Sequence, residues 1–195
     1  MNPTLAVDAM GGDVGPETVV PAALDFLRDH PEVDLLLFGD EEKILSSLGS
    51  CTALQERRLQ IRHCEQVVEM DESPTAAMRN KKKSSMRRAL DSVKSGEAQA
   101  CVSAGNTGAL MAIARFVFKM LPGIERPAIV QSLPSMRGQT TMLDLGANSE
   151  CRPEHLVQFA IMGSVLAEAV QGIDSPTVAL LNIGSEEMKG NDLVR

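Results

Sequence analysis

A short apolar segment, a glycine-bearing turn and an amphipathic helix follow one another repeatedly along this chain. The first such series is Leu5–Asp8, the turn Gly11–Gly15, and a helix that begins near Pro16 and ends before Pro31. Apolar residues in this helix recur with the 3.6-residue period of one helical face. Strands that alternate with helices in this way predict an α/β fold with a mostly parallel sheet covered on both faces.

The same pattern locates the other elements. Six further strands are predicted at Asp34–Phe38, Leu59–His63, Ala100–Ser103, Ala128–Gln131, Thr141–Leu145 and Thr177–Leu181. Helices are predicted after Gly39-Asp40 and up to Gly49, over Ala76–Ser95 with a break around Asn80–Ser84, behind Gly108 and up to Pro122-Gly123, and from Pro153 to Gly172. The last of these helices is apolar nearly all round, and we expect such a helix to be buried.

Chain length and hydrophobic content predict one domain. The 195 residues, 44% of them hydrophobic, suffice for a single α/β domain over 1–195 that buries roughly 70% of its unfolded surface. The chain stops at Arg195 without a closing element, so we expect the N-terminal part of a longer catalytic domain, incomplete at the C-terminus. No apolar run approaches the ~20 residues of a membrane span, and no signal peptide is recognisable. The expected compartment is the cytoplasm.

Composition and missing motifs argue against several classes of function. The net charge of −7 and the absence of Trp and Tyr argue against nucleic-acid binding, which favours basic surfaces and stacking aromatics. Cys51, Cys64, Cys101 and Cys151 form no CxxC pair and show no zinc-type spacing with histidine, so we expect free thiols and no metal site. The nucleotide-binding G-x-G-x-x-G and Walker A motifs and the G-x-S-x-G elbow are absent. No cofactor is expected.

Glycine-bearing turns follow several predicted strands, at Gly11–Gly15, Gly105–Gly108, Gly146–Asn148 and Gly184–Gly190. Ligands of open α/β sheets collect at the carboxyl ends of the strands. Glycine lets the backbone approach a ligand, and the helix start behind it offers free N–H groups, which together favour phosphate. One such turn could be a plain connection; the set of them favours a phosphate pocket.

Small polar side chains surround the second of these turns. Ser103, Asn106 and Thr107 could donate hydrogen bonds to a phosphate or to a developing oxyanion, or could cap the helix behind them; the sequence leaves both roles open. The carboxylates Asp8, Asp13 and Asp144 also stand at predicted strand ends, and their roles stay open. Cys151 with His155 is a weak candidate nucleophile pair.

A basic run interrupts an otherwise acidic chain. It contains Arg79, Lys81, Lys82, Lys83, Arg87 and Arg88. Such a run is either a solvated helix face or a surface for an acidic partner or phosphate. Ser84 and Ser85 lie inside it and carry hydroxyls suited to anion contact, which favours a function.

Several segments in order resemble the bacterial acyl carrier protein:phosphate acyltransferases. They are Asp8-Ala9-Met10-Gly11-Gly12-Asp13, Lys83-Ser84-Ser85-Met86, Ser103-Ala104-Gly105-Asn106-Thr107-Gly108-Ala109, Arg126-Pro127-Ala128, Asp144-Leu145-Gly146-Ala147-Asn148, and Asn182-Ile183-Gly184 with Glu187 and Lys189-Gly190. The resemblance runs from Val7 to Gly190. Each segment alone is weak, but their order makes the match specific.

The resemblance implies a three-layer α/β/α sandwich of the isopropylmalate-dehydrogenase-like kind. It also implies a homodimer that transfers a long-chain acyl group from acyl carrier protein to inorganic phosphate, giving acyl phosphate for phospholipid synthesis. Loose association with the inner membrane face, through the missing C-terminal part, and partnership with a membrane acyl-phosphate:glycerol-3-phosphate acyltransferase are further implications.

The hypothesis for the site follows from phosphate attack on a thioester, which needs no covalent acyl-enzyme. Proposed catalytic residues are Asn106, Thr107, Asn148 and Lys189. Proposed substrate and phosphate contacts are Gly11, Gly12, Asp13, Lys83, Ser84, Ser85, Ser103 and Gly105. Proposed carrier-docking residues are Arg79, Lys81, Lys82, Arg87 and Arg88. Two alternatives stay open: a phosphate acetyltransferase-like enzyme that uses acyl-coenzyme A, and a non-catalytic phosphate-ligand sensor or scaffold.

Overall fold

The protein is represented by a computed structural model that describes residues 2–49, 57–136, 138–148, 150–184 and 189–194. Contacts divide the chain into two compact units, Met1–Lys119 (unit 1) and Met120–Arg195 (unit 2), and each is described by itself. The expected single domain over 1–195 stays a prediction. Cys51 and Glu187, both named above, lie outside the described residues.

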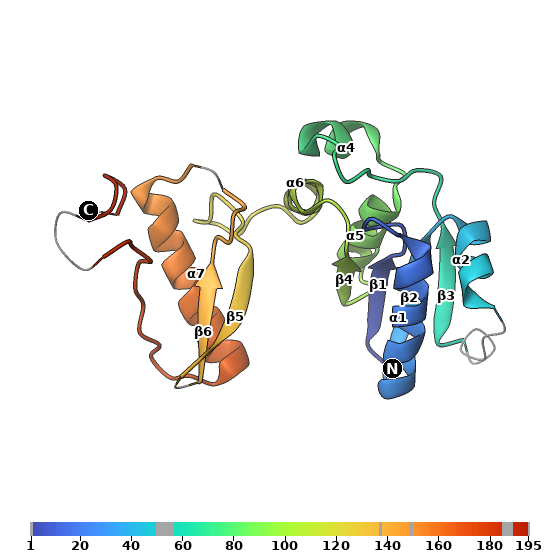
Figure 1. Cartoon of the computed structure of the whole chain (residues 1–195), viewed down its shortest axis with the longest axis horizontal. Coiled ribbons are helices and arrows are strands. Elements are labelled where there is room, and N and C mark those ends of the chain that lie inside the picture. The colour runs from blue at the N-terminus through green and yellow to red at the C-terminus, as the bar shows by residue number, and fades with distance from the viewer. Residues whose placement is uncertain (1, 50–56, 137, 149, 185–188, 195) are drawn as a thin grey trace. The chain divides into compact units, whose positions relative to one another are not determined.

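Unit 1 is built on a parallel sheet (Figure 1). Its strands are β1 (Thr4–Asp8), β2 (Asp34–Gly39), β3 (Leu59–His63) and β4 (Ala100–Ser103), in the order β3-β2-β1-β4. In the register of the sheet, Asp8 at the end of β1 lies opposite Phe38 of β2 and Ser103 of β4. The four predicted strands of this unit are thereby confirmed, with ends displaced by at most one residue.

Helices connect these strands. They are α1 (Pro16–Asp29), α2 (Glu41–Leu48), α4 (Pro74–Asn80), α5 (Ser85–Ser95) and α6 (Thr107–Phe118). The predicted break around Asn80–Ser84 is confirmed. Helix α4 ends at Asn80, and a new helix, α5, begins at Ser85 with Ser84 as its N-cap. Gly96 adopts the left-handed conformation that ends α5, as predicted. The helix behind Gly108 ends at Phe118, before the predicted stop at Pro122-Gly123.

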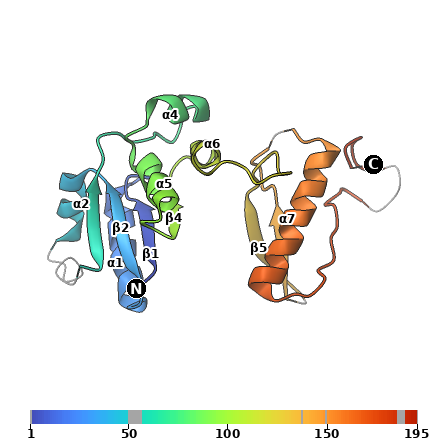
Figure 2. The same ribbon diagram turned by 180° about the vertical axis from the view of Figure 1, so that it is seen from behind.

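Helices cover both faces of the sheet. Leu35 and Leu37 of β2 pack with α1 and α2 on one face, whereas Leu36 and Phe38 pack with Ala89 of α5 on the other. This alternation follows the period of two along a strand. Figure 1 shows α1 in front of the sheet, and Figure 2, from behind, brings α5 forward. Unit 1 is therefore a three-layer α/β/α sandwich, as expected.

The remaining helices of unit 1 lie at the carboxyl end of the sheet. Both views place α4 and α6 beyond the arrowheads of the strands. Ala77 of α4, Met86 of α5 and Ile113 of α6 belong to one buried apolar cluster. This cluster holds the starts of three helices at the strand ends where a ligand is expected.

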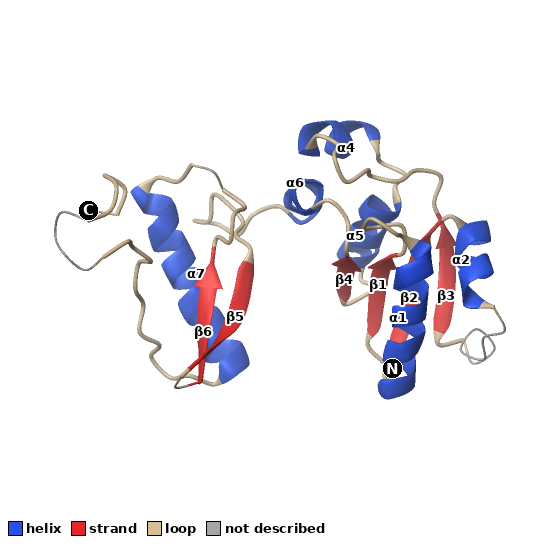
Figure 3. Ribbon diagram, in the orientation of Figure 1, coloured by secondary structure: helices blue, strands red, loops and turns tan. Residues whose placement is uncertain are grey.

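Unit 2 contains a hairpin and one long helix (Figure 3). Strand β5 (Val130–Ser135) pairs antiparallel with β6 (Gly138–Leu143), and α7 (Pro153–Gln171) follows. A Cβ atom on Gly163 would lie 2.7 Å from Leu143 Cδ1, so any larger residue at this position of α7 would have to displace the Leu143 side chain of β6. The strands predicted at Ala128–Gln131 and Thr141–Leu145 overlap β5 and β6, but their ends are misplaced by two residues or more, and the antiparallel pairing was not predicted.

Two predictions for unit 2 are wrong. Residues 177–181 form no strand, and Val178, Leu180 and Leu181 are exposed. An apolar, β-prone segment becomes a strand only where a neighbouring strand supplies hydrogen bonds.

The expected burial of α7 also fails on one of its faces. Phe159 and Ala167 are buried, but Val157, Ile161 and Val165 are 60%, 56% and 59% exposed. Because helical residues four apart share a face, these three form one exposed apolar stripe. None of the described helices is both long enough and apolar enough to cross a membrane.

Candidate functional site

The strand order of unit 1 brings two glycine turns together. Strands β1 and β4 are neighbours, so the turns that follow them, Gly11–Gly15 and Gly105–Gly108, meet at the carboxyl edge. A Cβ atom on Gly11 would lie 2.7 Å from the Gly105 nitrogen, and one on Gly105 would lie 3.0 Å from Met86 Cε. Any side chain at Gly11 would therefore force the two turns apart.

A partly buried hydrogen bond joins the two strands just below these turns. Ser103 Oγ donates to Asp8 Oδ2 at 2.7 Å, and the Gly105 N–H donates to Ser103 Oγ at 3.1 Å. Met10 N–H donates to the other carboxylate oxygen of Asp8 at 3.3 Å. Asp8 stands at a predicted strand end but is not among the predicted site residues.

Asn106 caps α6 and also holds a distant loop. Its Oδ1 accepts the Ala109 N–H at 2.9 Å. Its Nδ2 donates to the carbonyl oxygens of Glu69, Met70 and Glu72 at 3.3, 3.0 and 2.9 Å. Of the two roles that the sequence leaves open for Asn106, the structure shows the helix cap. Its assigned catalytic role stays a prediction.

The two serines at the start of α5 differ sharply. Ser84 is fully buried; its Oγ donates to Lys81 O at 2.8 Å and accepts the Arg87 N–H at 3.2 Å. Ser85 is also buried, yet its Oγ has no hydrogen-bond partner among the described residues. Its backbone N–H donates to Gln66 O at 3.1 Å. Ser85 is therefore the serine with hydrogen-bonding capacity to spare.

Most of the basic run is engaged within unit 1. Lys81 Nζ donates to Val67 O at 3.0 Å, Lys83 pairs with Glu65 at 3.0 Å, and Arg88 donates to His63 O at 2.8 Å. Arg87 pairs with Asp91 at 3.0 Å and lies 5.2 Å from the centre of the Phe116 ring. The pairing of Lys83 lowers the pKa of the Glu65 carboxyl, chiefly through their hydrogen bond.

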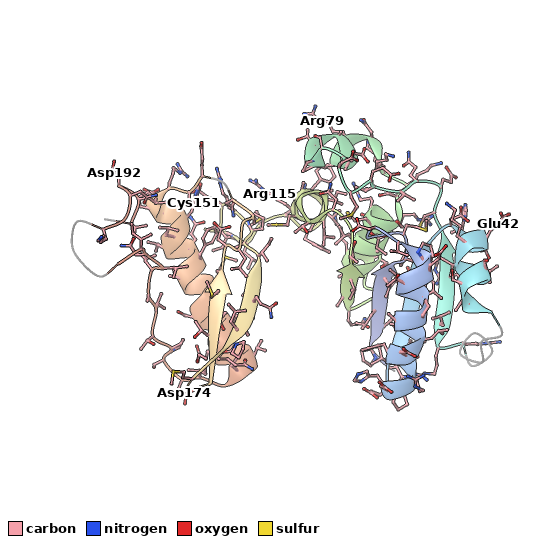
Figure 4. The ribbon with its side chains drawn as sticks, in the orientation of Figure 1. Glu42, Arg79, Arg115, Cys151, Asp174 and Asp192 are labelled. Carbon is pink, nitrogen blue, oxygen red and sulfur yellow. The ribbon has the colours of Figure 1, made fainter. Side chains whose placement is uncertain are left out.

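Two cations of the run have no ion-pair partner among the described residues. Within the part of the chain that the structure describes, no ion pair or side-chain hydrogen bond involves Arg79 or Lys82. Both are exposed, and Figure 4 shows Arg79 projecting outward from α4. Asp13 and Thr107, at the glycine turns, are exposed as well.

In unit 2, Asn148 fastens its own turn. Its Nδ2 donates to Asp144 Oδ1 at 2.8 Å and to Pro127 O at 3.0 Å, and its backbone N–H donates to Asp144 Oδ1 at 3.1 Å. Asp144 has a φ of 65°, a left-handed conformation that this network stabilises. The proposed charge-stabilising role of Asn148 stays a prediction. Lys189, also in unit 2, is exposed.

A second cluster in unit 2 was not anticipated as a set. His155 is buried at the start of α7, where its Nδ1 accepts the Arg152 N–H at 3.1 Å and its Nε2 lies 3.2 Å from Glu125 Oε2. The hydrogen bond from His155, with the charge of Arg152, lowers the pKa of Glu125. The sequence signal for this capping arrangement is the histidine two residues after Pro153. His155 is not available as a base for Cys151, because its Nδ1 accepts the Arg152 N–H and its Nε2 lies against Glu125.

The thiols are poor nucleophiles. Burial raises the pKa of Cys64 to about 11 and that of Cys101 to about 12, and the nearby Asp8 carboxylate adds to both shifts. Desolvation, with a hydrogen bond to Asp144, raises the pKa of Cys151. These three thiols are free, as predicted. The described residues contain no cluster of metal-binding side chains.

The chain matches a family model described as "Fatty acid synthesis protein" over residues 3–195. It is 58% identical over 192 residues to a phosphate acyltransferase of Halorhodospira halophila, covering 98% of this chain and 56% of the relative. A phosphate acyltransferase of Methylococcus capsulatus is also 58% identical over 192 residues, covering 98% and 57%. One of Chromobacterium violaceum is 55% identical over 195 residues, covering 100% and 56%. The chain spans about half the length of these curated relatives, and it belongs to the fatty acid synthesis protein family, in which phosphate acyltransferases are its relatives.

Proposed function

We propose that the chain is the N-terminal part of an enzyme that transfers a long-chain acyl group from acyl carrier protein to inorganic phosphate. The observation that carries this proposal is the meeting of two glycine turns, Gly11–Gly15 and Gly105–Gly108, at the carboxyl edge of a parallel sheet. Helix starts at such an edge favour a bound anion. The phosphate acyltransferase relatives at 55–58% identity support the choice of reaction.

The proposed reaction requires the protein to orient phosphate and thioester, and it requires no protein nucleophile. A phosphate oxygen attacks the thioester carbonyl carbon, the C–S bond breaks, and the carrier thiolate leaves and takes up a proton. Holding phosphate against the carbonyl lowers the barrier by several kcal/mol, and a donor to the developing oxyanion is typically worth ~3 kcal/mol. The raised pKa values of Cys64, Cys101 and Cys151 agree with a direct transfer.

Within unit 1, the free groups suited to phosphate are backbone N–H groups of the glycine turns, Thr107 at the start of α6 and the unpartnered hydroxyl of Ser85. Ser84 and Asn106 serve mainly to hold these elements in place, since their polar atoms are bound within the unit. The catalytic roles assigned to Asn148 and Lys189, which belong to unit 2, stay predictions.

The acidic carrier is proposed to meet Arg79 and Lys82, which keep their charge free. Arg87 and Arg88 are poor choices for a docking test, because charge reversal would also break their contacts with Asp91 and the His63 carbonyl. Arg79→Glu with Lys82→Glu should raise the KM for acyl carrier protein about tenfold or more, while the KM for phosphate stays unchanged. Lys43→Glu on α2, another exposed lysine, is the matched control, and an unchanged carrier KM would refute the docking assignment.

The decisive assay is phosphate-dependent release of carrier thiol from a long-chain acyl thioester, with hydroxylamine trapping of acyl phosphate. Because the chain spans 56% of its relative from Halorhodospira halophila, the assay compares the chain alone with the chain joined to the remaining C-terminal part of that relative. Turnover with the carrier thioester and not with acyl-coenzyme A supports the proposal. Turnover with acyl-coenzyme A alone would favour the acetyltransferase-like alternative, and phosphate binding without turnover in either form would favour a sensor or scaffold.

We further propose that the complete protein acts as a homodimer in the cytoplasm. Loose contact with the inner membrane face, where it would pass acyl phosphate to a membrane acyl-phosphate:glycerol-3-phosphate acyltransferase, belongs to the same proposal. Chemical cross-linking and flotation with vesicles of phosphatidylglycerol would test these two points on the complete protein.

A further inference from the structure

Asp8 is a buried carboxylate that no assigned role uses. It is 2% exposed and forms no ion pair with any residue that the structure describes. Burying a charge without a cationic partner is costly unless hydrogen bonds satisfy it. Its partners are the Ser103 hydroxyl at 2.7 Å and the Met10 N–H at 3.3 Å.

The Asp8 carboxylate decides what the Ser103 hydroxyl can do. A serine hydroxyl has one proton and two lone pairs. Ser103 donates its proton to Asp8 Oδ2, and one of its lone pairs accepts the Gly105 N–H at 3.1 Å. In this arrangement Ser103 has no proton to donate to phosphate.

The pair lies where the two glycine turns touch. The position of a Cβ atom on Gly11 would be 3.0 Å from Asp8 Oδ2, 3.1 Å from Ser103 Oγ and 2.7 Å from the Gly105 nitrogen. Carboxylate, hydroxyl and amide therefore surround a single backbone point of the first turn. Moving Ser103 would move the Gly105 turn against Gly11.

We propose that Asp8, acting through Ser103, is a positioning residue that sets the Gly105 turn against the Gly11 turn for phosphate. This inference rests on the proposed function and changes the role of Ser103, from a phosphate donor to an acceptor that fixes the Gly105 amide. Phosphate itself is then bound by the remaining backbone N–H groups of the turns and by Ser85.

The test is a titration of the chain with inorganic phosphate, followed through the amide resonances of Gly11, Gly12 and Gly105 by NMR. Ser103→Ala should weaken phosphate binding about tenfold, because it removes both hydrogen bonds that hold the Gly105 turn in place, one to Asp8 and one from the Gly105 N–H. Ser103→Thr keeps the hydroxyl and should bind phosphate as the wild-type chain does. Asp8→Asn should weaken phosphate binding too. A carboxamide has only one acceptor oxygen, whereas the two carboxylate oxygens of Asp8 accept from the Met10 N–H and from Ser103 Oγ.

The matched control is Ser92→Ala, which removes a buried serine hydroxyl that also donates at 2.7 Å, in this case to the Ala89 carbonyl. It should lower stability and leave phosphate affinity unchanged. Equal affinity of wild type and Ser103→Ala, or equal losses in Ser103→Ala and Ser92→Ala, would overturn the positioning role. If Ser103→Ala fails to fold, the comparison of Ser103→Thr with Asp8→Asn decides in the same way. A wild-type chain that binds no phosphate would instead refute the phosphate site of the proposed function, and this inference with it.

Discussion

Asn106 shows how much a single amide can determine in this protein. Its oxygen caps α6, and its nitrogen reaches carbonyl oxygens of the loop at residues 69–72, more than thirty positions earlier. The sequence suggests the cap, because Asn before a helix is a common N-cap. It cannot suggest the second bond, because that depends on a loop brought near by the fold.

Replacing Asn106 with Asp separates these two functions. The carboxylate can still accept the Ala109 N–H, but it faces the Met70 and Glu72 carbonyl oxygens without a proton to donate. We expect the free energy of unfolding of unit 1 to fall by about 1–3 kcal/mol, the usual cost of unsatisfied buried polar groups. Urea denaturation measures this loss. Asn80→Asp, at an exposed position, should cost only a few tenths of a kcal/mol, and equal losses at both positions would contradict the bonding role of Asn106.

The buried thiols make the stability of unit 1 fall at alkaline pH. The unfolded chain releases the Cys64 proton near the ordinary pKa of 9.0, whereas burial in the folded chain raises that pKa to about 11. Between these values the folded state holds more protons, so the free energy of unfolding decreases as pH rises. In Cys64→Ala this decrease between pH 9 and 11 should be smaller by about 1–3 kcal/mol. Urea denaturation at several pH values tests this, and identical slopes in both proteins would contradict it.

Local residue type predicted the candidate positions better than their roles. Ser103 and Asn106 stand beside the Gly105–Gly108 turn in the sequence, but each is bound to a partner that only the fold reveals. Asp8 and Ser103 are 95 positions apart, and His155 and Glu125 are 30 apart. No local pattern in a sequence encodes such pairs.

At the scale of elements, glycine and serine at the ends of segments were the most informative signals. Gly96 and the break after Asn80 were predicted from local chemistry, and both are present because caps act within one turn of the helix. The failures at residues 177–181 and on α7 have the opposite cause. There the outcome depends on whether another element supplies hydrogen bonds or covers an apolar face.

The two serines at the start of α5 provide a matched pair for a test of capping. Ser84→Ala removes a cap with two hydrogen bonds and should lower the free energy of unfolding by about 1–2 kcal/mol. Ser85→Ala removes a buried hydroxyl without a partner, so stability should stay the same or rise slightly. Thermal or urea unfolding gives the two values. Equal losses in both variants would mean that Ser85 is bonded in solution.

Substitutions on the two faces of α7 should affect the stability of unit 2 very differently. Phe159 is buried and Ile161 is more than half exposed, although the two stand on the same helix. Phe159→Ala should destabilise the unit by about 3 kcal/mol or more, whereas Ile161→Lys should change stability by less than about 0.5 kcal/mol. Loss of helical circular dichroism on heating gives both values. A large effect of Ile161→Lys would show that this stripe is covered in solution.

At the scale of the whole molecule, the two units differ in what can stabilise them. Unit 1 has a four-stranded sheet with apolar clusters on both faces. Unit 2 has a two-stranded hairpin with one helix. A two-stranded hairpin is marginal by itself, and packing against a helix is the least that stabilises it. The sequence predicted the first arrangement because strand and helix alternate there, and it gave no sign of the change at Met120.

Unfolding should therefore separate the units if they are independent. We expect unit 2 to unfold at a lower urea concentration than unit 1, so that the chain departs from a single two-state transition. Hydrogen exchange followed residue by residue should show greater protection for Leu35 and Leu37 of β2 than for Thr141 of β6, because the global core is the last to open. A variant that destabilises only one unit, such as Phe159→Ala in α7, should then shift one transition and leave the other unchanged. One transition for all probes, shifted as a whole by Phe159→Ala, would instead support the single domain over 1–195 that the sequence predicts.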